Sequence, residues 1–282
     1  MNNLNVSSED PDDFFDRVLA SKKNSAKDVN YKSRVNTYKP NIRRHFADYN
    51  YRFISGSLGA TTSQGYVDPV KKDLLRLYRY DTPLMQKLKV EVTTSSNDRI
   101  INTCQNCTIN AVNSLDHVLP KEELSEFSVH PKNLFPSCTE CNGKKNKFWQ
   151  DGGQLLFLNL YTDTLPNLQY LFVSVSFVDG LPGCKFTIGN PNGIDPLLYS
   201  VIETHYTRLG LLRRFEMNTN EVITNIEHQI LVNKGRLPRQ DIIDVIIEHN
   251  NLNRSSLGFN HWKSLLSIEL TNCQPYMDTL FS

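Results

Sequence analysis

Four of the six cysteines stand in two pairs whose spacing is typical of a metal site. Cys104 and Cys107 form the first CxxC pair, and Cys138 and Cys141 form the second. Four thiolates arranged in two such pairs bind zinc tetrahedrally, and a zinc ion with four protein ligands has a structural role. In a reducing compartment this spacing indicates a metal rather than disulfide bonds. The sequence therefore predicts a structural Zn²⁺ site.

The residues between and just after these pairs are suited to acid–base and metal chemistry. Asp116 and His117 are adjacent in LDHVLP. Asn133 lies in PKNLFPSC, and Asn142 directly follows the last cysteine of the pairs. Hydrolysis of a phosphodiester needs a base that deprotonates water and a divalent cation that stabilises the leaving oxygen. Because adjacent residues of a strand point to opposite faces, Asp116 and His117 can serve one site only where the strand bends.

The combined pattern of CxxC, DHVLP and NLFPSCxxCNxxK resembles the HNH endonucleases in which a four-cysteine zinc site staples the nuclease finger. This resemblance covers residues 98–150 and implies a ββα-metal fold. By the same resemblance, His117 is the general base that activates water, and Asn133 orders the loop between the strands and helps to orient the histidine. Asp116 and Asn142 are implied to be the ligands of the catalytic metal.

Asn142 occupies the motif position at which the resembled family usually has a histidine. An amide oxygen is a neutral, hard ligand that suits Mg²⁺ or Mn²⁺ better than zinc. We therefore expect a catalytic Mg²⁺ or Mn²⁺ in addition to the structural Zn²⁺. Lys144 and Lys145 follow on the expected finger helix, where they are predicted to contact phosphate. His130, three residues before Asn133, is expected to be a solvated loop side chain outside the site.

A weaker likeness extends outside this module. The motif HWKSLL near the C-terminus and the mid-chain position of the module resemble the Septu-type anti-phage nucleases, which implies a role in antiviral defence. The chain has no glycine-rich phosphate loop, so it has no ATPase motif of its own. Because an unrestrained nuclease is toxic, we expect a regulatory or activating protein partner, with an ATPase as one candidate.

Positive charge is concentrated before the cysteine pairs. The whole chain has a net charge of +1, but residues 22–79 hold many more Lys and Arg than Asp and Glu. Within this block Arg43 and Arg44 open the stretch RRHFADYNYRF, in which basic and aromatic residues are interleaved. Such a mixture suits phosphate pairing and base stacking, and it predicts contact with nucleic acid. The alternative is an ordinary core segment with arginines at its edge.

Hydrophobic spacing and turn residues predict the elements that position these side chains. We expect a helix over residues 10–23, with Asp10 as its N-cap, and a second helix over residues 68–88. Residues 24–65 show no clear period and are expected to be irregular, with an extended piece near YNYRFI. Residues 168–189 are rich in aromatic and β-branched residues and predict two strands joined at DGLPG. The C-terminal third shows helical spacing of Ile, Leu and Val and predicts a helical bundle.

Together these elements predict an α+β protein with three regions. Residues 1–97 form a basic and helical N-terminal region, residues 98–150 form the zinc-stapled finger, and residues 151–282 form a β-hairpin followed by mostly helical structure. The acidic, polar N-terminus lacks the pattern of a secretory signal, and no apolar run is long enough to cross a membrane. We therefore expect a cytoplasmic protein with no membrane partner.

The sequence as a whole favours a metal-dependent HNH-type endonuclease, with DNA preferred as the polymer. A ribonuclease that acts on RNA such as tRNA shares the same chemistry, because the catalytic groups act on phosphate and need not contact a 2′-hydroxyl. A non-catalytic zinc module that binds nucleic acid or a partner protein is the alternative from another class. Loss of turnover in EDTA would separate the enzyme from the binding module.

Overall fold

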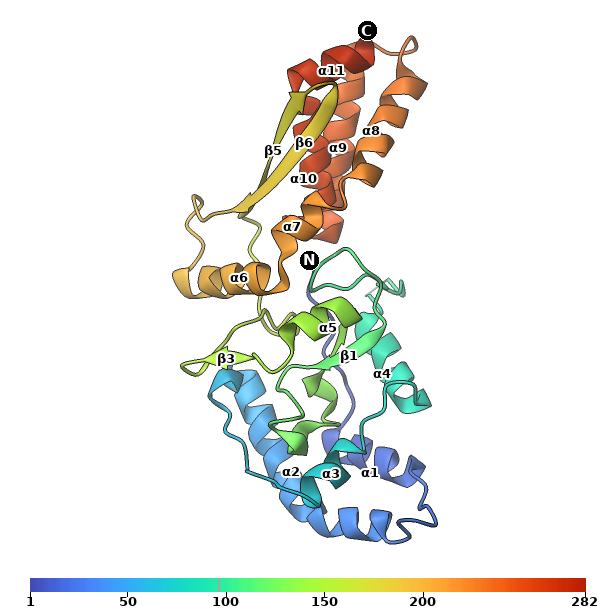
Figure 1. Cartoon of the computed structure of the whole chain (residues 1–282), viewed down its shortest axis with the longest axis vertical. Coiled ribbons are helices and arrows are strands. Elements are labelled where there is room, and N and C mark those ends of the chain that lie inside the picture. The colour runs from blue at the N-terminus through green and yellow to red at the C-terminus, as the bar shows by residue number, and fades with distance from the viewer. Residues whose placement is uncertain (96) are drawn as a thin grey trace. The chain divides into compact units, whose positions relative to one another are not determined.

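The computed structural model describes residues 1–95 and 97–282, which form two compact units. The first unit is Asn3–Thr164, and the second contains Leu165–Ser282 together with Met1–Asn2. Both combine helices with short antiparallel hairpins, so the predicted α+β class is confirmed (Figure 1). None of the helices in the described residues is long and apolar enough to cross a membrane.

The first helix of the first unit, α1 (Pro11–Ser21), begins as predicted. The Asp10 side chain accepts hydrogen bonds from the backbone N–H groups of Asp12 and Asp13, both at 3.0 Å. These bonds satisfy two of the amide donors that a helix N-terminus leaves free, and the proline at the first position needs no such partner. The apolar face of α1 is buried, as its spacing predicted: it contains Phe14, Phe15, Val18 and Leu19.

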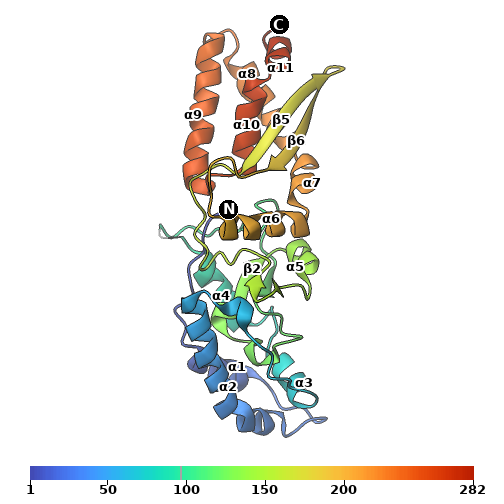
Figure 2. The same cartoon turned by 90° about the vertical axis from the view of Figure 1, so that its left-hand side faces the viewer.

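The prediction of irregular structure between residues 24 and 65 was wrong. Helix α2 (Tyr31–Ser55) fills most of this stretch and includes the segment expected to be extended, YNYRFI (Figure 2). Pro40 stands inside the helix at an exposed position, and the polar residues around it obscure the apolar period. Burial of one face outweighs the poor helix propensity of proline. The buried positions do follow helical spacing: Tyr31, Val35, Ile42, Phe46, Tyr49 and Phe53.

The single helix expected over residues 68–88 is in fact two helices, α3 (Val70–Leu75) and α4 (Pro83–Thr93). The break falls before Pro83, because a proline ring disfavours the helical conformation of the preceding residue. Thr82 is extended accordingly, with a ψ of 147°. Helix α4 then starts with Pro83 in its first turn, where a missing N–H costs no hydrogen bond.

A strand–strand–helix segment follows, in the order that the sequence predicted. Strands β1 (Ser114–His117) and β2 (Leu134–Ser137) pair antiparallel, and α5 (Thr139–Lys145) begins two residues after β2 ends. The connection between the strands contains two short 3-10 helices, η2 (Ser125–Phe127) and η3 (Pro131–Asn133). The segment therefore brings the end of β1, the connection between β1 and β2, and α5 close together in space.

The N-terminal helices belong to the same unit as this ββα segment. Helices α2 and α3 pack against η2, and α4 packs against β2. A small hairpin, β3 (Gln150–Asp151) with β4 (Gln154–Leu155), lies against the 3-10 helix η1 (Leu58–Ala60). The boundaries expected after residues 97 and 150 both fall inside this unit.

The second unit opens with the hairpin that the sequence predicted, β5 (Leu171–Val178) and β6 (Leu181–Ile188). Asp179 and Gly180 form its two-residue loop, with φ values of 52° and 78°. A loop with two residues in this left-handed region matches the right-handed twist of the strands, and Asp-Gly is a preferred pair for it. The strand prediction is confirmed, and the loop is shorter than the expected DGLPG because its last three residues belong to β6.

The region after this hairpin is helical, as predicted, and its helices pack against the hairpin. Strand β5 packs against α10 and β6 packs against α7 (Figure 2). The ring of Trp262 stacks on Phe215 at 5.2 Å between centroids and meets Phe186 edge-on at 6.1 Å. These rings form the centre of the core of the second unit. Its helices are α6 (Pro196–Leu209), α7 (Leu211–Glu216), α8 (Asn220–Asn233), α9 (Arg239–Leu257), α10 (Trp262–Asn272) and α11 (Gln274–Phe281).

Candidate functional site

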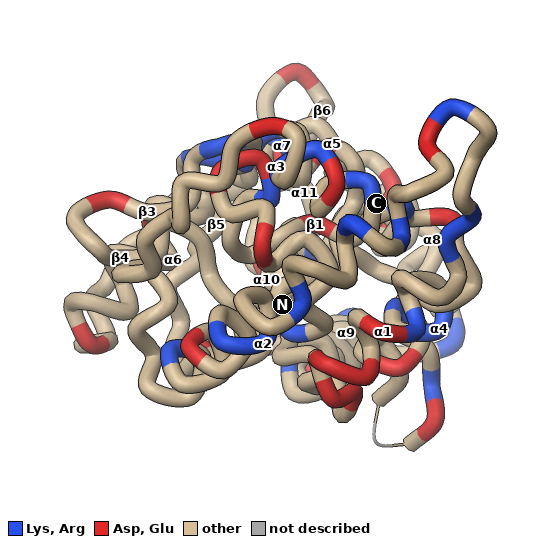
Figure 3. Tube along the Cα trace, turned by 90° about the horizontal axis from the view of Figure 1, so that it is seen from below, with Lys and Arg blue, Asp and Glu red and all other residues tan. Residues whose placement is uncertain are grey.

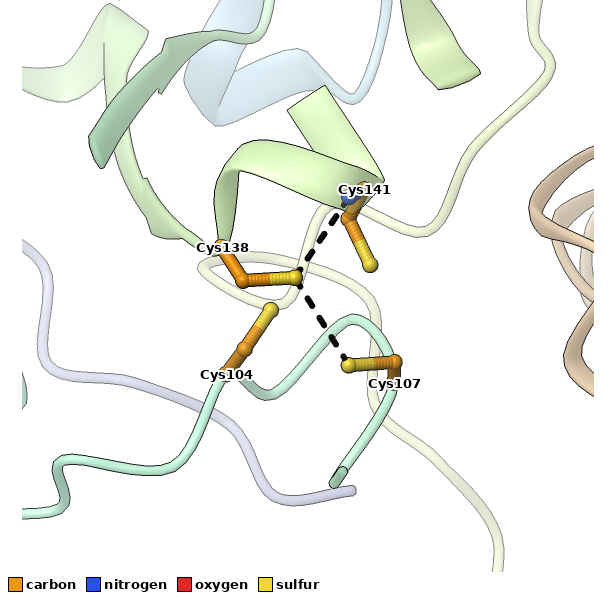
Figure 4. Close-up of side chains that lie close together, drawn as sticks. All are labelled: Cys104, Cys107, Cys138 and Cys141. Carbon is orange, nitrogen blue, oxygen red and sulfur yellow. Dashed lines mark hydrogen bonds between the residues drawn. The ribbon is translucent and has the colours of Figure 1, made fainter. Parts of the chain in front are cut away.

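The four paired cysteines converge in one buried cluster (Figure 4). Their sulfur atoms all lie within 4.8 Å of one another, and each residue is at most 1% exposed. The sulfurs of Cys107 and Cys138 are 3.9 Å apart. A tetrahedral zinc ion with bonds of about 2.3 Å needs sulfur atoms about 3.8 Å apart, whereas a disulfide needs about 2.05 Å. The cluster of free thiols therefore has the size and ligand set to hold a zinc ion.

Local backbone geometry brings the two pairs together. The N–H groups of Cys107 and Thr108 donate to the Cys104 carbonyl at 3.3 and 2.7 Å, which turns the first pair inward. Cys138 is the N-cap of α5, and its sulfur accepts a hydrogen bond from the Cys141 N–H at 3.4 Å. Hydrogen bonds among the four thiols lower the pKa of Cys107 to about 7 and also lower that of Cys138, while they raise the pKa values of Cys104 and Cys141. The thiolate form, which binds metal, is therefore favoured at Cys107 and Cys138.

Asp116 lies on β1 and interacts with α5. Its Oδ2 atom is 3.0 Å from Nζ of Lys145, and its Oδ1 accepts a hydrogen bond from the His117 N–H at 2.7 Å. Burial raises the pKa of Asp116, and the ammonium group of Lys145 opposes this rise. The chain therefore holds the carboxylate in place through both of its oxygens.

His117 is the last residue of β1 and contacts the connection between the strands. Its Nε2 lies 2.9 Å from the Ser128 carbonyl oxygen, and because a carbonyl only accepts, Nε2 carries the proton. Nδ1 then has the free lone pair. Tyr78 packs edge-on against the ring at 4.6 Å between centroids, and burial lowers the pKa of His117 to about 3. The imidazole is therefore neutral at pH 7, with Nε2 fixed and a lone pair left on Nδ1.

Asn133 is fully buried and ties down the connection between β1 and β2. Its amide nitrogen donates to the carbonyls of Leu119 and Phe127 at 3.1 and 3.0 Å. Its Oδ1 accepts hydrogen bonds from the Leu119 N–H at 2.7 Å and from the Tyr49 hydroxyl at 3.3 Å. These four bonds join the two ends of the connection to each other and to α2.

Substitution of Asn133 by Asp should destabilise the first unit by about 3–5 kcal/mol, because two buried carbonyls lose their donor and a buried charge replaces it. Urea unfolding can be followed by Trp149 fluorescence in a Trp262→Phe background, which makes Trp149 the single tryptophan reporter of the first unit. The exposed Asn102→Asp change is the control and should alter stability by less than about 0.5 kcal/mol. Equal effects of the two substitutions would contradict the assigned hydrogen bonds.

Helix α5 places its polar residues in different surroundings. Asn142 is half-buried, and its Nδ2 lies 3.4 Å from the Ser114 hydroxyl, which leaves Oδ1 as its atom for a cation. Lys144 is exposed, whereas Lys145 is buried and donates to the His117 carbonyl in addition to its ion pair. Lys145 therefore differs from the expectation that both lysines face phosphate. It lies three residues after Asn142, so the two share the helix face that meets β1.

The nucleic-acid contacts expected at Arg43 and Arg44 lie on α2. Arg43 is 3.5 and 3.4 Å from the carboxylates of Asp12 and Asp16 on α1, and Figure 3 shows acidic (red) segments of the trace beside the α1 label. Arg44 is exposed. Three of the four aromatic rings that follow are buried, and Tyr51 is 71% exposed. The segment thus matches the alternative reading of a core helix with arginines at its edge.

The expectation that His130 is solvated was wrong, because its residue is 0% exposed. Its ring centroid lies 4.1 Å from that of Tyr49 and 4.8 Å from that of Phe46, both on α2. Within residues 1–95 and 97–282, neither ring nitrogen has a hydrogen-bond partner. Burial holds the pKa of His130 well below 6.5, and the charge of Lys132 lowers it further. The imidazole therefore packs as a neutral aromatic ring.

His130 should make the first unit less stable as the pH falls. In the unfolded chain its imidazole takes up a proton near the ordinary pKa of 6.5, whereas the folded state keeps it neutral. The contribution of His130 to the free energy of unfolding is therefore fully present above a pH of about 6.5. At lower pH it decreases, by up to about 1.4 kcal/mol per pH unit. His130→Phe keeps the ring packing and removes the titration, so its free energy of unfolding should fall less steeply on acidification.

The measurement for His130 is urea unfolding at a pH of about 7 and of about 5, with Trp149 fluorescence in the Trp262→Phe background. Protonation of His117 and of the cysteines contributes to the pH dependence of the free energy of unfolding in both proteins. The difference between the pH dependences of the wild-type and His130→Phe proteins therefore isolates the effect of His130. Identical pH dependence in the wild-type and His130→Phe proteins would contradict the neutral buried state.

Two further side chains near His117 were not assigned to the site from the sequence. Tyr78 covers the ring, and its hydroxyl donates to the Leu115 carbonyl at 2.7 Å. Lys121 is half-buried, and its Nζ lies 5.9 Å from the centroid of the Tyr78 ring. Tyr78 lies within the stretch expected to be one helix over residues 68–88, but it follows the end of α3. No local motif marks Tyr78, because it reaches His117 through tertiary packing.

Comparison with known proteins gives one partial match. The chain is 31% identical to Protein ea31 of Escherichia phage lambda over 109 residues, which are 37% of this chain and 36% of that protein. The match thus covers about a third of the length of this relative. No family model matches the chain, and no solved structure matches it.

Proposed function

We propose that the chain is a metal-dependent endonuclease of the HNH type that hydrolyses phosphodiester bonds. The observation that carries this proposal is the adjacent placement of Asp116 and His117 on β1, beside a helix tied to a four-cysteine cluster. The lone pair on Nδ1 of His117 suits proton abstraction from water, and Asp116 offers a carboxylate for a cation. A base and a metal-binding carboxylate on one fixed strand are the groups that this hydrolysis needs.

The cysteine cluster is proposed to hold a structural zinc ion. Cys138 caps α5, and the first cysteine pair precedes β1, so a shared ion would tie the start of the helix to the chain that enters the first strand. A zinc ion with four sulfur ligands has no open position for water. Its role in the proposal is therefore to fix the register of α5 against β1.

A second divalent cation, Mg²⁺ or Mn²⁺, is proposed at Asp116 and Asn142. Their elements meet at this place, because Asn142 contacts Ser114 and Lys145 contacts Asp116 across β1 and α5. Carboxylate and amide oxygens are the ligands that these hard cations prefer. The cation would stabilise negative charge on the phosphate and the leaving oxygen.

The remaining residues position these groups in the proposal. The Ser128 carbonyl fixes Nε2 of His117 and so leaves Nδ1 as the nitrogen that would take the proton of the attacking water. Asn133 holds the connection that carries Ser128. Lys144, exposed near the end of α5, is suited to contact a backbone phosphate.

The test of the proposal is cleavage of supercoiled plasmid, linear DNA and total tRNA by the purified protein, each with Mg²⁺, Mn²⁺ or EDTA. We expect cutting of at least one polymer with a divalent cation, no cutting in EDTA, and loss of cutting in Asp116→Ala. Asp241→Ala, at an exposed position on α9, is the matched control and should retain activity. Binding of nucleic acid without cutting under all conditions would favour the non-catalytic zinc module.

The same assay distinguishes DNA from RNA. DNA is the preferred polymer of the proposal, but the assigned groups act on phosphate and suit either polymer. Cleavage of tRNA with intact plasmid would identify a ribonuclease with the same site, and it would overturn the DNA preference alone.

A further inference from the structure

Lys145 gives the candidate site a cation that belongs to the chain. Its side chain is 9% exposed, and its Nζ lies 3.0 Å from Oδ2 of Asp116. The same ammonium group donates to the His117 carbonyl. Oδ1 of Asp116 accepts the His117 N–H at 2.7 Å. Each carboxylate oxygen of Asp116 thus has a partner within the protein.

We infer that Lys145 is a built-in counter-cation that competes with the divalent metal for Asp116, an inference that rests on the proposed function. Mg²⁺ binds a carboxylate oxygen at about 2.0–2.1 Å and tolerates little distortion of its ligand shell. An ammonium group on the same oxygen repels such a cation at close range, where the surroundings screen charge poorly. Metal binding therefore requires Lys145 to leave Asp116, and Lys145 sets the metal concentration at which the site fills.

The location of Lys145 allows this exchange. It is the last residue of α5, so its side chain can leave Asp116 without any change in the helix. Lys144 and Lys147, on either side of it in the chain, are exposed. A buried ammonium is costly unless an anion pairs with it, so Lys145 needs Asp116 or another negative group in its place. Of these three lysines, Lys145 alone forms a buried ion pair with Asp116.

The inference is tested by Mn²⁺ binding to the zinc-loaded protein, measured from the electron paramagnetic resonance signal of free Mn²⁺. The variants are Lys145→Met, which keeps the unbranched shape and most of the length of the side chain without its charge, and Lys145→Gln, which keeps a hydrogen-bond donor without the charge. Both should bind Mn²⁺ at least about tenfold more tightly than wild type, a difference of about 1.4 kcal/mol. Lys147→Met, two residues away and exposed, should change the affinity by less than about twofold.

The outcomes separate this inference from the proposed function. The competition is supported if both Lys145 variants bind Mn²⁺ more tightly than wild type and if this gain is lost when Asp116→Asn is added. Equal affinity in wild type and the Lys145 variants, with binding that still needs Asp116, overturns the competition and leaves the metal-dependent nuclease intact. Weaker binding in the Lys145 variants also overturns it, because Lys145 would then support the metal site. No Mn²⁺ binding by any folded, zinc-loaded variant would overturn both proposals.

Discussion

The His117→Ala protein is expected to cleave nucleic acid about 10²- to 10⁴-fold more slowly than wild type in single-turnover reactions, which is the usual contribution of a general base. His117 is assigned this role because its Nε2 is bound to the Ser128 carbonyl and its Nδ1 is left to accept a proton. The measurement is the rate of plasmid nicking at saturating Mg²⁺. The alanine change removes the imidazole and leaves Asp116 and the cysteines in the chain.

A second variant separates loss of the base from loss of structure. His117→Gln can donate to the Ser128 carbonyl through its amide nitrogen but has no basic atom, so it should be as inactive as His117→Ala with better stability. His249→Ala, at an exposed position on α9, is the histidine control and should cleave at the wild-type rate. A His117→Gln rate within about twofold of wild type would exclude the imidazole as the base.

Cys138→Ser is expected to abolish zinc binding and to unfold the ββα segment. Structural zinc sites in small modules contribute about 10–16 kcal/mol of binding free energy, and much of the folding of such a segment depends on it. Cys138 is the most sensitive of the four positions, because its sulfur also accepts the Cys141 N–H at the start of α5. Zinc content per chain and hydrogen exchange across residues 104–145 measure the two effects.

The control for Cys138 is Cys184, a half-buried cysteine of β6 in the second unit. Cys184→Ser should retain one zinc ion per chain and wild-type exchange across residues 104–145. If Cys138→Ser also kept one tightly bound zinc and a protected α5, the cluster would not be the structural metal site proposed for it.

The parts of the fold that the sequence predicted depend on local signals. The two cysteines of each CxxC pair are only three residues apart, so their spacing alone indicates a metal site. Asp179-Gly180 predicts a hairpin loop because both residue types favour the backbone conformation that such a loop needs. The N-cap at Asp10 is equally local, because its Oδ1 accepts hydrogen bonds from N–H groups two and three residues away. Signals of this kind do not depend on the rest of the molecule.

Other features depended on tertiary packing and were not predicted. Helix α2 forms around Pro40 because residues as far apart as Tyr31 and Phe53 bury the same face. The sequence places Lys144 and Lys145 side by side, and only the register of α5 against β1 determines which of them meets Asp116. The burial of His130 likewise follows from the way the connection between the strands folds against α2.

Dependence of cleavage on a divalent cation other than zinc is tested by an assay in which that cation alone is withdrawn from zinc-loaded protein. A chelator concentration that removes Mg²⁺ but leaves one zinc ion per chain is set beforehand by metal analysis. We expect cutting to stop in the chelator and to return when Mg²⁺ is restored, with zinc content unchanged throughout. Cutting that continues without Mg²⁺, or no cutting of DNA or RNA with Mg²⁺ present, would contradict this expectation.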